Sequence, residues 1–170
     1  MINIRQATED DLPAMLDIYN EIILTTTAVW QYDPHTLSMR QEWFTIKQQL
    51  GHPVYVATEG AALVGFSTFG PFRNWQGYRY TVENSVYVAA HHRGRGIAKL
   101  LMPPLIAAAK QLNIHAIVAG IEASNEISIA LHQQFGFVEV AHFKEVGFKF
   151  NRWLDLKFLQ LVIEHNNSND

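Results

Sequence analysis

The most informative stretch of the chain reads Val86-Tyr-Val-Ala-Ala-His-His-Arg-Gly-Arg-Gly-Ile-Ala-Lys-Leu-Leu101. Val86 to Val88 are typical of a buried strand, and Ile97 to Leu101 open a helix with an apolar face. Between them, glycines let backbone N–H groups turn toward one point, and the N-terminus of the following helix aims its positive dipole end at the same point. Arg93 and Arg95 add side chains suited to phosphate. The stretch therefore predicts a strand, an anion-binding loop and a helix.

The spacing of this loop narrows the choice of anion. A Walker loop requires Gly-x-x-x-x-Gly-Lys-Ser/Thr, and a dinucleotide loop requires Gly-x-Gly-x-x-Gly with an acidic residue about 20 positions further on. Neither pattern is present. Arg93, Gly96 and Ala98 instead resemble the Arg/Gln-x-x-Gly-x-Gly/Ala pyrophosphate loop of the GNAT superfamily of N-acetyltransferases, with Ala98 where the commoner loop has its last glycine. Taken alone, a strand-to-helix turn with surface arginines is the alternative.

The composition fits a single globular domain. The chain has 170 residues, of which 48% are hydrophobic and 17% charged, which is enough for one full hydrophobic core. Its net charge of −3 and its pI near 6.2 provide no general basic field, so nucleic acid is not expected as a partner. The absence of cysteine excludes disulfides and a cysteine acyl-enzyme.

Neither a secretion signal nor a membrane span is expected. The N-terminal residues carry acids where a signal has its apolar core. The most apolar segment, residues 100–109, is about half as long as a membrane span and contains two prolines. We therefore expect a cytoplasmic protein without a membrane partner.

The hydrophobic pattern predicts an α+β domain with a mixed central sheet of about seven strands and about four flanking helices. Expected strands cover residues 2–5, 54–58, 63–69, 81–88, 115–121, 137–145 and 153–163, and expected helices cover residues 8–23, 36–50, 97–112 and 125–135. Pro103 and Pro104 lie inside the third helix, where proline removes donors and clashes with the preceding turn. We expect a kink near Lys99 to Leu101 or a helix that restarts at Pro103. Residues 1–165 are expected to form one domain and residues 166–170 a flexible tail.

Further segments extend the resemblance over nearly the whole chain. They are Tyr80-Thr-Val-Glu-Asn-Ser-Val-Tyr-Val88, Ala119-Gly-Ile-Glu-Ala-Ser-Asn125, Ser128-Ile-Ala-Leu-His132, Gly136-Phe137 and Gly147-Phe-Lys-Phe-Asn-Arg-Trp-Leu-Asp155. Each alone is weak, but their order and spacing together resemble the phosphinothricin and methionine sulfoximine acetyltransferase branch of the GNAT superfamily. The resemblance implies the GNAT acyl-CoA acyltransferase fold, with acetyl-CoA as co-substrate.

The resemblance also implies a set of residues that bind acetyl-CoA. In this fold the strand before the loop separates from its neighbour, and its backbone pairs with the pantetheine arm, which requires an open strand edge rather than particular side chains. Asn125 matches the family asparagine near the thioester, although a helix N-cap is an equally good interpretation. The implied cofactor-binding residues are Val86, Tyr87, Val88, Arg93, Gly94, Arg95, Gly96, Ile97, Ala98, Asn125 and Ser128.

The transfer step requires a neutral amine, because an ammonium has no lone pair with which to attack. Glu83 is the candidate base, directly or through water. Strand alternation places it with Ser85 and Tyr87 on the face opposite Val82, and an ordinary solvated or salt-bridged carboxylate is the alternative. His132 stands where many relatives carry a tyrosine that protonates the leaving thiolate, and it is either this acid or a buried structural histidine. Direct transfer in a ternary complex is the simplest mechanism.

The segment 71–80, Pro-Phe-Arg-Asn-Trp-Gln-Gly-Tyr-Arg-Tyr, mixes two arginines with four aromatic residues. It suits a small zwitterion, because a guanidinium binds the α-carboxylate, aromatic rings exclude water and Glu83 faces the amine. Relatives carry an arginine at Arg73, with Arg79 as the second choice, and Trp30 is expected to close the other side. The expected substrate-binding residues are Trp30, Arg73, Asn74, Trp75, Glu83 and Ser85. A surface loop packed by its own rings is the alternative.

The sequence thus predicts an N-acetyltransferase for the α-amine of phosphinothricin, methionine sulfoximine or methionine sulfone, three amino-acid analogues that it does not rank. Because phosphinothricin is a herbicide, the resemblance also implies herbicide resistance. A polyamine or protein N-terminal acetyltransferase is the enzyme alternative, although a polyamine would require acidic surroundings rather than arginines. A non-catalytic CoA-binding module is the alternative of another class. No metal is expected, because the eight histidines lack helical i, i+4 pairing and acidic partners at ligand spacing.

The C-terminal part of the chain predicts an assembly. It holds more large apolar residues than one sheet face of this size would bury, namely Phe148, Phe150, Trp153, Leu154, Leu156, Phe158, Leu159 and Leu161. We expect a homodimer through these strands, with the turn that carries Lys149, Asn151 and Arg152 near the partner's substrate loop.

Overall fold

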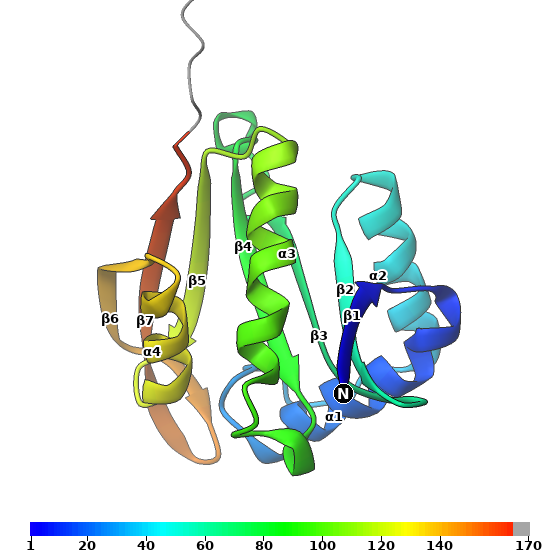
Figure 1. Cartoon of the computed structure of the whole chain (residues 1–170). Coiled ribbons are helices and arrows are strands. Elements are labelled where there is room, and N and C mark those ends of the chain that lie inside the picture. The colour runs from blue at the N-terminus through cyan, green and yellow to red at the C-terminus, as the bar shows by residue number, and fades with distance from the viewer. Residues whose placement is uncertain (165–170) are drawn as a thin grey trace, which may run out of the picture.

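Seven strands form one sheet in the order β1-β2-β3-β4-β5-β7-β6 in the computed structural model, which describes residues 1–164 (Figure 1). Within these residues the β4–β5 pair is parallel, and the other neighbouring pairs are antiparallel. The strands are β1 (Ile2–Gln6), β2 (Val54–Glu59), β3 (Ala62–Pro71), β4 (Thr81–Val88), β5 (Ala116–Glu122), β6 (Val138–Lys149) and β7 (Arg152–Val162). The α-helices are α1 (Leu12–Thr25), α2 (Leu37–Gln49), α3 (Ile97–Gln111) and α4 (Glu126–Gln134). The expected mixed α+β fold is confirmed.

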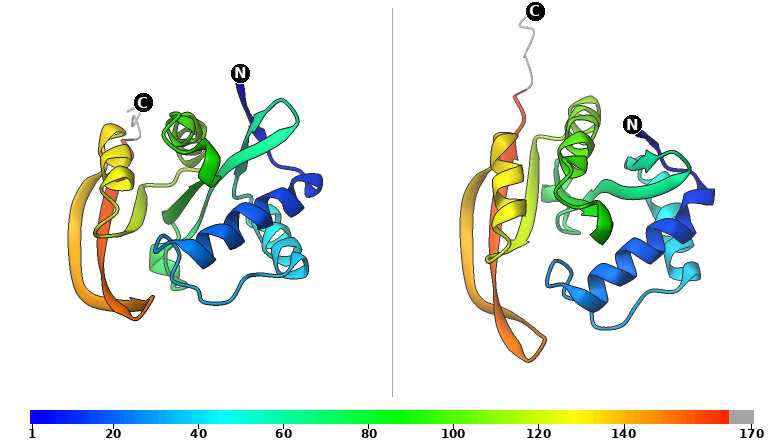
Figure 2. Two further views of the ribbon diagram at one scale, coloured as in Figure 1. Left: turned by 90° about the horizontal axis from the view of Figure 1, so that it is seen from below. Right: turned by 60° about the horizontal axis from the view of Figure 1, so that its bottom comes forward.

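Helices cover both faces of the sheet (Figure 2). On one face, Met15 of α1 packs with Val56 and other residues of the sheet and α2. On the other face, Leu101 of α3 packs with Ala57. Val56 and Ala57 are neighbours in β2 and point to opposite faces because side chains alternate along a strand. The sheet is therefore buried on both sides, which fixes β4 and β5 firmly in its middle.

Local polar contacts start the first two helices. The Asp11 carboxylate accepts a hydrogen bond from the Thr8 backbone N–H at 2.8 Å and is held by two Arg5 nitrogens, each at 2.7 Å. These Arg5 contacts are the main reason that the pKa of Asp11 is lowered. Thr36 Oγ1 accepts from the Met39 N–H at 3.2 Å and caps α2.

The two prolines do not interrupt the third helix. A single helix, α3, runs from Ile97 to Gln111 with Pro103 and Pro104 inside it, so the expected restart at Pro103 is wrong. Its buried side chains include Leu101, Met102 and Leu105. Burying such a side chain fully contributes about 1.5–3 kcal/mol, and three of them offset a cost of about 3 kcal/mol for each proline. Packing against the sheet therefore outweighs the local preference.

β6 is longer than predicted, and it meets β7 in a tight turn. Phe150 and Asn151 form this turn with φ of +49° and +56°, which is the geometry of a two-residue hairpin turn. The tail expected at 166–170 lies outside the described residues. Within residues 1–164, the helices are too short or too polar to cross a membrane.

Candidate active site

The parallel strands β4 and β5 separate after three residue pairs. Thr81–Glu83 pair with Ala116–Val118, after which β4 stays with β3 and β5 follows β7 (Figure 1). The stretch Asn84–Val88 therefore has no strand on its β5 side among the described residues. The resemblance implies such an open edge at Val86 to Val88, and the structure contains it.

A cavity of about 220 Å³, which we call the transfer cavity, lies where β4 and β5 separate. Its walls come from β4, β5, α4 and the segment that joins α1 to α2. The lining includes the predicted residues Glu83, Ser85, Val86, Tyr87, Asn125, Ser128 and His132. It also includes residues that the sequence did not single out, namely Ala28, Val29, Asn84, Ala119, Gly120, Ile121 and Glu122. Four separate parts of the chain thus meet at one site.

Glu83 projects from β4 over Gly120 of β5. A Cβ atom at Gly120 would lie 2.8 Å from Glu83 Oε1, so the glycine makes room for the carboxylate. Burial raises the pKa of Glu83, and the positive charge of Arg73 opposes that shift. Within residues 1–164 the carboxylate has no hydrogen-bond or ion-pair partner. A carboxylate with a raised pKa and free oxygens is suited to accept a proton from an amine.

The hydrogen bonds of His132 bear on its predicted role as an acid. Its side chain is 4% exposed, and burial lowers its pKa. Nδ1 lies 2.7 Å from the Ser128 carbonyl oxygen and so carries the proton, while Nε2 lies 2.9 Å from Asn84 Nδ2 and accepts. This neutral tautomer has no free N–H for a leaving thiolate. The geometry favours the structural interpretation that the sequence left open, and the acid role stays a prediction.

Asn125 caps the helix that forms the far wall of the transfer cavity. Its Oδ1 accepts from the Ser128 N–H at 3.1 Å, so the N-cap interpretation holds. The same side chain lines the cavity, and its predicted place near the thioester stays a prediction. Asn84 adds a second polar group, because its Oδ1 is buried without a partner within residues 1–164.

The glycine loop has the predicted backbone shape, but its arginines are engaged elsewhere. Gly94 and Gly96 have φ of +74° and +75°, and Gly96 is the N-cap of α3. Arg93 donates to the Val88 carbonyl and to Glu21 at 2.9 Å. Arg95 forms a two-point pair with Glu59, at 2.9 and 2.6 Å. What the loop itself offers to an anion is therefore its backbone N–H groups, since Ile97 is buried and Ala98 is a small side chain.

The segment 71–80 does not enclose a site within one chain. Trp75 is 74% exposed, and neither Arg73, Asn74 nor Trp75 lines the transfer cavity. The ring centroids of Trp75 and Tyr78 are 6.3 Å apart, and the Arg73 guanidinium lies 4.5 Å from the Phe72 ring centroid. Within the single chain, Trp75 and Tyr78 contact each other on the surface and Phe72 also contacts the Phe158 ring of β7, so the expectation that these rings exclude water from a substrate stays a prediction.

Lys149, at the end of β6, lies next to the C-terminal turn. Its side chain is 3% exposed and points into its own chain rather than outward. Nζ donates to the carbonyl oxygens of Ile23, Thr26 and Val29 at 2.5, 2.8 and 2.7 Å. The ammonium thus holds the start of the α1–α2 segment, which forms a wall of the transfer cavity. A lysine in a hairpin gives no sequence signal for contacts more than a hundred residues away.

Trp30 and Glu122 hold the same segment from other directions. The Trp30 ring packs against Gly147 so tightly that no side chain would fit there, and its Nε1 donates to the Thr27 carbonyl at 2.9 Å. Glu122 accepts from Thr27 Oγ1 at 3.1 Å and from Ser124 Oγ at 2.5 Å. Trp30 therefore supports a wall of the transfer cavity without lining it. Sequence reasoning missed Glu122. Its place two residues after Gly120 was a usable signal, because residues two apart on a strand point to the same face.

Separated strands and a capped helix around one cavity, together with a glycine loop at the N-terminus of α3, are the features of an acyl-CoA acyltransferase. The acetyltransferase (GNAT) domain family matches residues 4–157. The chain belongs to this family and is an N-acetyltransferase. Within residues 1–164, no group of three or more His, Asp or Glu side chains is placed to hold a metal ion.

Known relatives support this assignment along the whole chain. The L-methionine sulfoximine/L-methionine sulfone acetyltransferase of Salmonella typhimurium is 41% identical over 99% of both chains. The phosphinothricin N-acetyltransferase of Streptomyces coelicolor is 35% identical over 94% of this chain and 95% of its own. The structure of an acetyltransferase from Salmonella typhimurium with its cofactor acetyl-CoA has a TM-score of 0.95 at 41% identity, and the match covers 99% of this chain and 98% of that one.

Proposed function

We propose that this N-acetyltransferase acts on the α-amine of a small amino-acid analogue of the methionine sulfone or sulfoximine type, with phosphinothricin as a weaker acceptor. The observation that carries the proposal is the unpartnered carboxylate of Glu83 in a cavity beside an open strand edge. The order of acceptors follows the relatives, since the sulfoximine enzyme is 41% identical and the phosphinothricin enzyme 35%. Herbicide resistance and a cytoplasmic location stay predictions.

The described residues fit acetyl-CoA, which supplies an activated acetyl thioester. The open backbone of Val86 to Val88 offers groups to the amides of the pantetheine arm. Asn84 Oδ1, buried and without a partner in the described chain, fits a bound amide N–H. Asn125 and Ser128 lie across the cavity and complete this side. The backbone of Gly94 to Ala98 is proposed to receive the pyrophosphate.

In the proposed step, the nitrogen of the amine forms a bond to the thioester carbonyl carbon, and the carbon–sulfur bond breaks. Glu83 takes the proton that the amine loses, directly or through one water. The thiolate that leaves takes its proton from solvent or from a group that stays unassigned, because both ring nitrogens of His132 are engaged. Arg73 is proposed to bind the α-carboxylate, supported by its electrostatic effect on Glu83. Trp30, Asn74, Trp75 and Ser85 are proposed to shape the acceptor side.

We further propose a homodimer formed through β6, an edge strand of the sheet. Leu154 and Leu159 are buried in the core, so they are not part of the proposed interface. The apolar residues exposed along this edge are Val138, Val140, Phe143, Val146, Phe148, Phe150 and Trp153. A long exposed apolar edge is a strong reason for pairing with another chain. Light scattering at micromolar concentration should give a dimer mass, and a monomer mass would overturn this proposal.

A CoA-release assay with matched acceptors tests the proposed substrate class. The acceptors are L-methionine sulfone, L-methionine sulfoximine, phosphinothricin, spermidine and a short peptide with a free N-terminus. We expect the sulfone and the sulfoximine to have the highest kcat/KM. Faster transfer to the peptide would make the chain a protein N-terminal acetyltransferase, and no release with any amine would leave only a CoA-binding module.

A further inference from the structure

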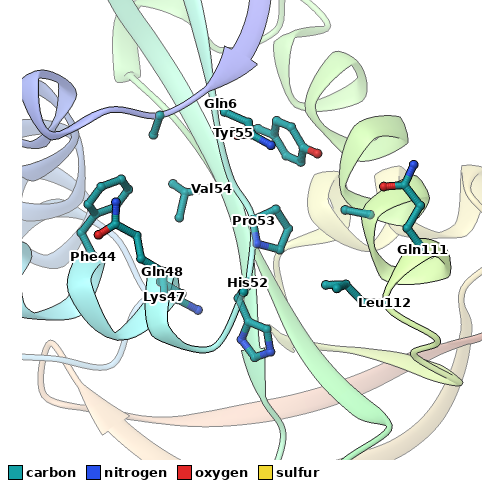
Figure 3. Close-up of a pocket in the computed structure, with 13 residues that line it drawn as sticks. Gln6, Phe44, Lys47, Gln48, His52, Pro53, Val54, Tyr55, Gln111 and Leu112 are labelled. Carbon is teal, nitrogen blue, oxygen red and sulfur yellow. The ribbon is translucent and has the colours of Figure 1, made fainter.

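A second cavity, of about 380 Å³, lies between the C-terminal parts of α2 and α3, and we call it the α2–α3 cavity (Figure 3). Its walls come from α2, the segment that joins α2 to β2, the start of β2, the end of β1 and the end of α3. It shares no described residue with the transfer cavity. A volume at the lower end of the range for small-molecule sites suits a ligand of amino-acid size.

The α2–α3 cavity has positive charge on one side that no acid balances. Lys47 is 8% exposed, and its Nζ donates to the Phe69 carbonyl at 2.5 Å. Among residues 1–164 no carboxylate pairs with it, and none lines the cavity. Arg40, seven residues earlier on the same helix, does not line the cavity, and its guanidinium lies over the rings of Tyr19 and Trp43, 4.3 and 4.6 Å from their centroids. Burying cations without counter-charges costs free energy, so an anion beside Lys47 would be stabilising.

His52 provides a second group beside Lys47. Its ring lines the cavity and contacts the Phe69 ring, while its Nδ1 has no open surface and no partner within the described chain. Figure 3 shows the Lys47 side chain extending toward the side of the cavity on which the His52 ring lies. Burial and the charge of Lys47 lower the pKa of His52, so its ring is neutral and has one N–H to donate. The ammonium keeps two further N–H groups after its bond to Phe69.

We propose that the α2–α3 cavity binds a small organic monocarboxylate that carries no cationic group, with its carboxylate on Lys47 and His52. Gln48 and Gln111 offer amides to the other polar groups of this ligand, and Phe44 and Leu112 offer apolar contact to its carbon skeleton. A zwitterionic amino acid fits less well, because the described lining holds no acid for its ammonium.

The helix ends distinguish a carboxylate from a phosphate at this site. Gln48 and Gln111 lie in the last turns of α2 and α3, so both helices present the negative ends of their dipoles. This arrangement disfavours a dianion, whereas one ammonium and one imidazole N–H suffice for a single carboxylate. N-acylated amino acids, which have a carboxylate and a neutral amide, belong to the favoured class.

Residue-resolved NMR titration of the whole protein tests the proposal without measuring activity. The probes are N-acetyl-L-methionine, L-methionine and inorganic phosphate, and the reporters are the side-chain amide signals of Gln48 and Gln111. We expect saturable shifts with N-acetyl-L-methionine and at least about tenfold weaker binding of the other two probes. In Lys47→Met the dissociation constant should rise at least about tenfold, as expected for the loss of a charge-assisted hydrogen bond.

Two further variants complete the test. Lys110→Met removes an exposed lysine close to the cavity and should leave the affinity within a factor of about two, as for other surface charges. His52→Phe keeps a ring, loses the N–H and should bind more weakly. Shifts confined to residues of the transfer cavity, equal binding in Lys47→Met, or tighter binding of phosphate or L-methionine at Gln48 and Gln111 would each overturn the proposal. This result is independent of whether the transfer activity is found.

Discussion

The transfer site has two halves that are built differently, one proposed for acetyl-CoA and one proposed for the acceptor. The cofactor half consists of an open strand edge at Val86 to Val88, two left-handed glycines and a capped helix, all set by backbone geometry within one chain. The acceptor half depends on side chains from distant segments, and its 71–80 loop lies exposed. A ligand common to a whole family can be bound by preset backbone, whereas a particular acceptor requires side chains that other contacts must hold in place.

Glu83 lies where the two halves meet, and its variant should have the largest effect. We expect Glu83→Gln to lower kcat by about 10²-fold or more, because a glutamine cannot take the proton of the amine. Because burial raises the pKa of Glu83, wild-type activity should fall as pH drops through this raised pKa, and the variant should lose this limb. Initial rates between pH 5 and 9 measure both effects.

The same variant should be more stable than wild type. A carboxyl whose pKa is raised on folding contributes stability at low pH that is lost as pH rises through its folded pKa. At pH 8 the ionised carboxylate of Glu83 is a cost that the neutral amide of the variant does not carry, so the melting temperature should rise. A lower melting temperature together with full kcat would show that Glu83 is structural.

The next largest effect should be confined to the cofactor half. Gly96 has φ of +75° and open space around it, so a side chain there strains the backbone without a clash inside the protein. We expect Gly96→Val to raise the Kd of acetyl-CoA by roughly thirtyfold, in line with strain of about 1–2 kcal/mol and a loop moved away from the phosphates. Gly51→Val, at φ of +65° and equally open, is the matched control. If calorimetric titration gives both variants the same Kd for acetyl-CoA, the phosphates bind elsewhere.

A smaller effect should be confined to the acceptor half. Arg73 is proposed to bind a carboxylate that is unchanged in the reaction, so Arg73→Ala should raise the KM of the amino acid by about tenfold and change kcat less. The Kd of acetyl-CoA should stay the same. Arg79→Ala serves as the control in the same loop. If steady-state kinetics show that Arg79→Ala raises KM more than Arg73→Ala does, the carboxylate contact belongs to Arg79.

Lys149 should give the smallest kinetic effect and a clear loss of stability. Lys149→Met leaves three carbonyls without their donor, at a cost of about 1–3 kcal/mol, and one kcal/mol shifts the melting temperature of a chain of this size by about 2–4 °C. We expect a fall of several degrees and a few-fold rise in the KM of the acceptor. Lys144→Met, which removes a surface ion pair of the same strand, should change neither. Calorimetric scans of both variants give the comparison.

The same contrast explains what the sequence could predict. The glycine loop, the Asn125 cap and the order of the elements are local patterns, and the structure contains them. The places of Lys149 and Glu122 depend on contacts between segments about a hundred residues apart, and the exposure of Trp75 depends on how its loop packs, which no local pattern shows. The expected restart of the helix at Pro103 is wrong for the opposite reason, because packing against the sheet outweighs a local rule.

The central claim is that the acceptor is an amino acid held by its carboxylate while its amine is acetylated. The most direct test compares the rates of CoA release with L-methionine sulfone and with its decarboxylated amine. Wild type should lose at least about tenfold in kcat/KM with the plain amine, because Arg73 then has no partner. Arg73→Ala should already be slow and should change little between the two acceptors. If wild type acetylates the plain amine as fast as the amino acid, the chain is an N-acetyltransferase of another acceptor class and the account of its substrate is wrong.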